Sequence, residues 1–86
     1  MELTVYGPLR AATGDKTVDV TVNGETAGDV IDAFVAAYPR AAAQLEDSEG
    51  RLRPSVRILV DGDQAAVEDH LPPDPTVALF PAMRGG

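Results

Sequence analysis

The sequence predicts an α+β roll, in which a mixed sheet of four to five strands packs against one main helix on one face. Two observations favour this fold class. Short runs of alternating apolar and polar residues lie in both halves of the chain, and one segment of helical periodicity separates them. The chain has 86 residues, which is the length of one small domain. We place this domain at residues 1–81 and a flexible C-terminal tail at residues 82–86.

The N-terminal part predicts two adjacent strands. Residues 1–6 alternate in polarity, with Leu3 and Val5 on one face. A Gly-Pro pair ends this strand, and residues 9–13 predict one helical turn. Residues 17–22 predict the second strand, whose three valines share a face. Because the two strands are neighbours in the sequence, we expect them to form a hairpin-like pair.

The main helix begins with a recognisable cap. Thr26 and Asp29 have the spacing of a capping box, in which the hydroxyl accepts from the Asp29 amide and the carboxylate lies at the positive end of the helix. The apolar residues that follow have helical spacing: Val30, Ile31, Phe34, Val35 and Tyr38. Pro39 either ends this helix or begins a second short one through residues 43–45.

The second half of the chain predicts short strands joined by loops. A polar loop is followed by three expected strands, and these segments are 46–53, 56–60, 64–67 and 76–80. Asp61-Gly62 predicts the turn between the first two strands. Arg57 and Leu59 face away from the core-facing side of their strand. We expect Val20, Val30, Phe34 and Ile58 in the core, and nothing after Phe80 predicts burial.

Composition argues against several functions. Acidic residues number 14 against 7 basic ones, and the net charge of −7 disfavours nucleic acid and favours a partner with a basic surface. The chain has no cysteine, and its one histidine, His70, lies in a predicted loop beside Asp69. We therefore expect no catalytic residues, no metal site and no enzyme. No apolar run approaches the ~20 residues that span a bilayer, so we expect a cytoplasmic protein without a membrane role.

The sequence ends in Gly85-Gly86, which has a chemical use. Glycine lacks Cβ, so it can thread a channel too narrow for other residues, and Gly86 presents a bare carboxylate at the tip. An ATP-dependent partner can activate such a carboxylate as an acyl adenylate. Fully extended, the residues after Phe80 reach about 20 Å. The alternative is a frayed end or a cloning remnant.

Several motifs together resemble a known family. Their order along the chain is Leu9-Arg10-Ala-Ala-Thr-Gly14, Thr26-Ala-Gly-Asp29-Val30-Ile31, Tyr38-Pro39, and Val77-Ala78-Leu79-Phe80-Pro81 before Gly85-Gly86. This combination is similar to the ubiquitin-like β-grasp proteins of the MoaD/ThiS type, which include the molybdopterin and thiamin sulfur carriers and the small archaeal ubiquitin-like modifiers. The chain departs from the family's usual PP-V-x-GG ending after Pro81.

The resemblance implies a ubiquitin-like β-grasp fold and a mechanism. An E1-like enzyme would use ATP to adenylate Gly86, and the chain itself would hold no cofactor stably. The acceptor would be a protein of the molybdopterin synthase large-subunit type or the lysines of target proteins. Tyr6, Leu59 and Phe80, with Arg57 nearby, would dock these partners. Alternation along the strands independently places Tyr6 and Leu59 away from the core.

Three functions stay open at this point. The chain is a thiocarboxylate sulfur carrier for molybdopterin or tRNA thiolation, a modifier joined to lysines by isopeptide bonds, or both. The alternative is a non-covalent interaction module with an inert tail. Lys16 is the only lysine, so it is the one side-chain amine available for self-conjugation. We expect it to be exposed in its loop.

Overall fold

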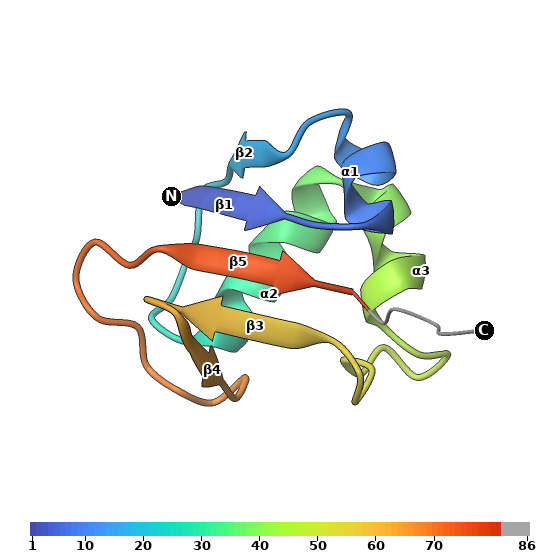
Figure 1. Ribbon diagram of the computed structural model, residues 1–86. Helices are drawn as coiled ribbons and strands as arrows, with labels where there is room; N and C mark the ends of the chain where they lie inside the picture. Colours follow the sequence, from blue (N-terminus) through green and yellow to red (C-terminus); the bar gives the residue numbers. More distant parts are fainter. Residues whose placement is uncertain (82–86) are drawn as a thin grey trace.

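One mixed sheet of five strands runs through residues 1–81, the part of the chain that the computed structural model describes (Figure 1). The strands are β1 (Glu2–Val5), β2 (Thr17–Asp19), β3 (Arg57–Val60), β4 (Asp63–Ala65) and β5 (Val77–Phe80). Their order across the sheet is β2-β1-β5-β3-β4. The last strand, β5, is central, parallel to β1 and antiparallel to β3. The chain therefore reaches its C-terminal residues from the middle of the sheet.

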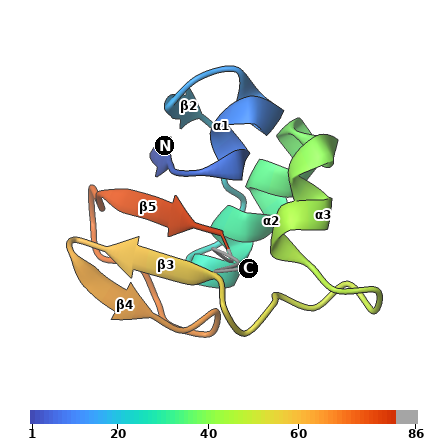
Figure 2. The same cartoon turned by 45° about the vertical axis from the view of Figure 1, so that its right-hand side comes forward.

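The helices lie on one side of this sheet (Figure 2). They are α1 (Pro8–Thr13), α2 (Ala27–Ala37), the 3-10 helix η1 (Pro39–Ala41) and α3 (Ala42–Leu45). Phe34 and Val30 of α2 are fully buried with Ile58 of β3 and Val20, as predicted. On the opposite face of the sheet, Leu59 and the other outward side chains keep contact with solvent. The predicted α+β roll with one main helix is thus confirmed, and one sheet face is left uncovered.

A capping box starts α2, as the sequence predicted. The Asp29 amide donates to the Thr26 hydroxyl over 3.2 Å, while the Asp29 carboxylate accepts from the backbone amides of Thr26 and Glu25 at 3.1 and 3.0 Å. Gly24 precedes this box with φ of +133°. A Cβ at position 24 would overlap the Asp29 carboxylate of the capping box, and the positive φ also favours glycine there.

These hydrogen bonds make the stability of α2 depend on pH. The bonds from the Thr26 backbone and side chain, followed by that from the Glu25 backbone, hold the pKa of Asp29 below its ordinary value of 3.8. A carboxyl whose pKa is lower in the folded state stabilises the fold above pH 3.8, and this contribution disappears as the pH falls through the folded pKa.

Asp29→Ala should therefore lower the free energy of unfolding near neutral pH, and its difference from the wild type should shrink below pH 3.8. Urea titrations at several pH values measure this difference. Asp32→Ala is the matched control, because Asp32 is an exposed carboxylate on the same helix with no hydrogen bond within the described residues. A difference that stays constant from neutral to acidic pH would contradict the assignment.

The first turn of α2 is also held by the segment before β5. The amides of Ala27 and Gly28 donate to the carbonyls of Asp69 and Val67 at 2.9 and 2.8 Å. This contact corrects the predicted edge strand at 64–67. The strand, β4, begins one residue earlier and ends at Ala65, because the next residues turn their backbone toward the helix. Asp61-Gly62 forms the predicted turn, with φ of 53° and 86° at its two residues.

The strands predicted at 1–6, 56–60 and 76–80 are each shorter by one or two residues at their ends. Two larger differences concern the strand at 17–22 and the end of the buried segment. The predicted strand 17–22 is shorter: Val20 still exchanges hydrogen bonds with Met1, but β1 offers no partner beyond that point. The sequence predicted no burial after Phe80, but Pro81 is buried. Both differences arise from the neighbours that the fold supplies, which a local pattern does not contain.

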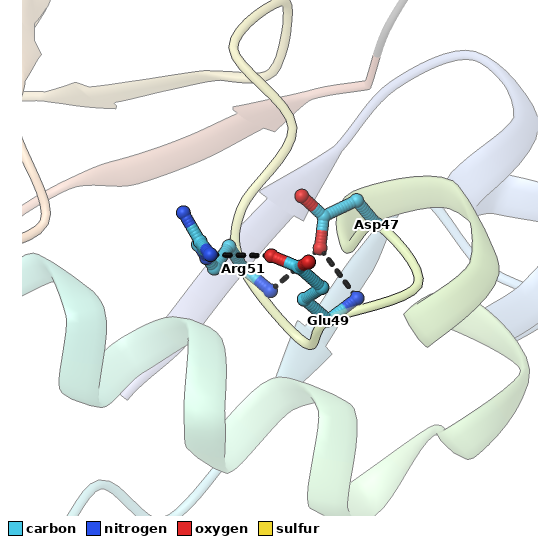
Figure 3. Close-up of polar contacts among 3 residues, drawn as sticks. All are labelled: Asp47, Glu49 and Arg51. Atoms are coloured by element: carbon cyan, nitrogen blue, oxygen red, sulfur yellow. Dashed lines mark hydrogen bonds and ion pairs between the residues drawn. The ribbon is translucent and has the colours of Figure 1, made fainter.

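The predicted loop 46–53 is closed by its own polar groups (Figure 3). One carboxylate oxygen of Asp47 accepts from the backbone amides of Glu49 and Arg51 at 2.8 and 3.0 Å. The Arg51 guanidinium also pairs with the Glu49 carboxylate at the surface. Both side chains of this pair are well exposed, so we assign the loop's order mainly to the turn made by Asp47.

Candidate functional site

An aromatic pair lies on the uncovered sheet face, where β1 and β5 end. The rings of Tyr6 and Phe80 are stacked with centroids 4.2 Å apart and an interplanar angle of 7°. Tyr6 follows β1 directly, and its amide donates to the Leu79 carbonyl over 3.2 Å, which continues the pairing of β1 with β5. The strand register therefore brings the two rings side by side although 74 positions separate them (80 − 6).

Arg57 and Leu59 complete the set of predicted docking residues. Arg57 is the register partner of Phe80, and Leu59 is the partner of Ala78 on the same face. Tyr6, Phe80 and Arg57 thus lie side by side across the adjacent strands β1, β5 and β3. Leu59 lies two residues further along β3 on the same face. We call this set the aromatic patch: Tyr6, Arg57, Leu59 and Phe80. Its assignment as a docking surface remains a prediction.

A hollow of about 620 Å³ adjoins the aromatic patch. Its lining combines patch residues with the segment before β3 and the start of the C-terminal residues: Pro54, Ser55, Arg57, Leu59, Gln64, Phe80 and Pro81. The buried Pro81 fixes where the chain leaves the sheet. The segment that leads to Gly86 therefore begins at the edge of this hollow.

Arg10 is a residue of this surface that the strand pattern did not identify. Its guanidinium carbon lies 5.3 Å from the centroid of the Tyr6 ring, and its Nε donates to the Val5 carbonyl over 3.1 Å. Pro8 is at the first position of α1, and this short helix turns the chain back so that Arg10 reaches the ring. The sequence signal was the Gly7-Pro8 break before a helical turn.

The remaining predicted residues lie elsewhere or outside the described part. Lys16 is exposed between α1 and β2, as predicted, while its carbonyl accepts from the Val5 amide at 2.9 Å. His70 is an exposed loop residue, and its backbone forms an isolated bridge with Thr26. Gly85 and Gly86, together with the expected tail at 82–86, lie outside the described residues.

The described residues contain no group of acidic or histidine side chains arranged to hold a metal ion. Within the same part of the chain, no helix is long and apolar enough to cross a membrane. What this part of the structure offers is a surface: two stacked rings, an aliphatic side chain and two arginines at the point where the C-terminal residues begin. A mixed five-stranded sheet with one main helix packed on one face is the arrangement of a ubiquitin-like β-grasp protein.

The chain belongs to the ThiS family, whose model matches residues 3–86. It is 33% identical to small archaeal modifier protein 1 of Haloferax volcanii, over the full length of both chains. The crystal structure of that protein superposes with a TM-score of 0.88 and covers 100% of this chain and 98% of the other.

Two further structures extend the likeness. Mycobacterium tuberculosis CysO is 27% identical, with a TM-score of 0.74 over 94% of this chain and 97% of its own. CysO in the Amycolatopsis orientalis BexX/CysO complex is 23% identical, with a TM-score of 0.76 over 99% of this chain and 98% of its own, which shows the fold alone. These matches confirm the β-grasp fold. They place the chain in a family of small ubiquitin-like sulfur carriers and modifiers.

Proposed function

We propose that this chain is activated at the Gly86 carboxylate by an E1-like, ATP-dependent enzyme in the cytoplasm, and that the aromatic patch docks that enzyme. The observation that carries the proposal is the stacked Tyr6–Phe80 pair at the end of the central strand. The residues after Phe80 reach about 20 Å when fully extended. An enzyme that binds the Tyr6–Phe80 pair would therefore receive the Gly86 carboxylate in an active site within about 20 Å of that pair.

The chemistry uses the carboxylate and needs no cofactor bound to the chain. A carboxylate oxygen attacks the α-phosphorus of ATP, pyrophosphate leaves, and an acyl adenylate forms. A sulfide nucleophile then attacks the carbonyl carbon, AMP leaves, and a thiocarboxylate remains. If a lysine amine attacks instead, AMP leaves, the amine loses a proton, and an isopeptide bond forms. The E1-like enzyme binds the ATP. The acceptor is a protein of the molybdopterin synthase large-subunit type, a tRNA-thiolating enzyme or a target protein.

Mass spectrometry on protein from the native host separates these two uses. Replacement of one oxygen by sulfur at the C-terminus supports the carrier. A Gly-Gly remnant on lysines of other proteins, after cleavage at Arg84, supports the modifier. Self-conjugation would place the same remnant on Lys16, which the fold leaves exposed.

Phe80→Asp tests the docking role of the aromatic patch. It removes one ring of the stacked pair and places a charge at the centre of the patch, so the KM for the chain in adenylation should rise about tenfold or more. The core should persist, because Phe80 is half-buried on the uncovered face whereas Leu79 is fully buried. ATP–pyrophosphate exchange with the E1-like enzyme measures the effect.

Val67→Asp is the control for Phe80→Asp. Val67 is the exposed large apolar residue of the described part, 41% accessible, and lies in the segment against the start of α2. This variant has the same change in net charge and should leave the KM within about twofold, as expected for a surface substitution away from the docking site. Equal KM values for the two variants would place the docking surface elsewhere.

A further inference from the structure

Charge is unevenly distributed along the uncovered sheet face. Glu2, at the start of β1, is the register partner of Asp19 at the end of β2, and both side chains are exposed. At the other end of the face, Arg57 lies beside Phe80, and Arg10 lies over Tyr6. Asp19 pairs with the N-terminal ammonium of Met1 over 2.9 Å, so this end keeps one net negative charge, from Glu2. The end that carries the aromatic patch is basic.

The hollow beside the aromatic patch is likewise lined by a basic side chain and by no acidic one among the described residues. All 14 acidic residues of the chain lie between Glu2 and Asp74, and none of them lines the hollow. Arg57 is the charged side chain among the described residues that do line it. In a chain with a net charge of −7, a surface with arginine and no carboxylate is the opposite of what composition predicts.

Local charge governs the contact more than net charge does. Electrostatic interactions are screened over about 8 Å at physiological ionic strength, so remote carboxylates act weakly on a docked partner. Arginine presents several donors in a planar fork that suits a carboxylate. The bond from Arg10 Nε to Val5 orients its guanidinium over the Tyr6 ring and leaves the terminal amino groups available.

We propose that the partner surface docking on the aromatic patch is apolar at its centre and acidic at its rim, with carboxylates that pair with Arg10 and Arg57. This inference rests on the proposed function, since it specifies the partner of the same surface. It reverses the expectation of a basic partner that the net charge of the whole chain raised. Glu2, at the other end of the face, in turn disfavours docking of this partner at that end of the sheet.

A charge series at position 57 tests the proposal. Arg57 is exposed and makes no side-chain hydrogen bond within the described part of the chain, so its replacement should leave the fold intact. The KM for the chain in ATP–pyrophosphate exchange with the E1-like enzyme should rise in the order Arg57→Lys, Arg57→Gln, Arg57→Glu. We expect the last to raise it about tenfold with little change in kcat. Added salt should reduce the difference.

Arg40→Glu is the matched control, because Arg40 is exposed on η1, outside the aromatic patch, and the change in net charge is the same. Its KM should stay within about twofold of the wild type. Unfolding midpoints confirm that every variant is folded. Equal KM values for Arg57→Glu and Arg40→Glu, or a lower KM for Arg57→Glu, would contradict the proposal that the partner surface has an acidic rim. If the wild type supports no exchange, or if exchange persists without Gly85 and Gly86, the proposed function itself is wrong. This inference then fails with it.

Discussion

Deleting Gly85 and Gly86 should abolish ATP–pyrophosphate exchange by the E1-like enzyme and all transfer that follows. The deletion moves the terminal α-carboxylate to Arg84, two residues short of the position at which it would attack ATP. The Arg84 side chain is also too bulky for a channel that admits glycine. Thermal unfolding should change by less than about 0.5 kcal/mol, because the deletion leaves the core of the domain intact. Docking should survive, because the aromatic patch is intact, so the truncated chain should compete with the wild type.

Gly85→Ala is the graded control for this deletion. It keeps the carboxylate and adds only one Cβ, so exchange should fall less than it does in the deletion. Calorimetry on both variants verifies that the domain is unchanged. Full exchange activity in the truncated chain would exclude both the carrier and the modifier and would favour a non-covalent β-grasp module with an inert tail.

Phe34→Ala should be among the most destabilising single substitutions in the domain. Phe34 is fully buried between α2 and the sheet, and its ring is 5.5 Å from that of Tyr38. Truncation of a buried phenylalanine costs about 3–5 kcal/mol, through lost apolar burial and the cavity left behind. This is a large part of the roughly 5–15 kcal/mol that stabilises a small domain. The change in midpoint of a denaturant titration measures it.

Val35→Ala serves as the control for Phe34→Ala. Val35 is the next residue on α2 and is only partly buried, so its truncation should cost clearly less. A loss below about 1 kcal/mol for Phe34→Ala, no greater than typical of a surface position, would show that this ring does not support the core.

The course of the chain was largely predictable from local patterns. Period-two alternation identified β1, β2 and β3, and helical periodicity with the Thr26–Asp29 box identified α2. These signals are strong because each side of a strand or helix meets either core or solvent along its whole length. Strand ends were predicted less well. Val20 and Ala65 lie at points where pairing depends on which neighbour the fold supplies.

The aromatic patch was only partly predictable. Alternation places Tyr6 and Leu59 on the outward side of their strands, but it does not say which strands are adjacent. Phe80 was ambiguous, because its neighbour Leu79 is also apolar; the structure turns Leu79 into the core and Phe80 outward. The contact of Arg10 with Tyr6 depends on the turn at Gly7 and on α1, so no periodicity could predict it.

The sequence by itself determined the parts whose physics is local: the main helix and its cap, the strand faces and the core residues. The tertiary structure decided what depends on distant contacts. By placing β5 between β1 and β3, it stacked Tyr6 on Phe80 and set Arg57 beside them. Among the described residues, it also kept acidic side chains out of the lining of the hollow. Composition reports only the sum of charges, whereas a docking surface depends on where they lie, and strand pairing decides that.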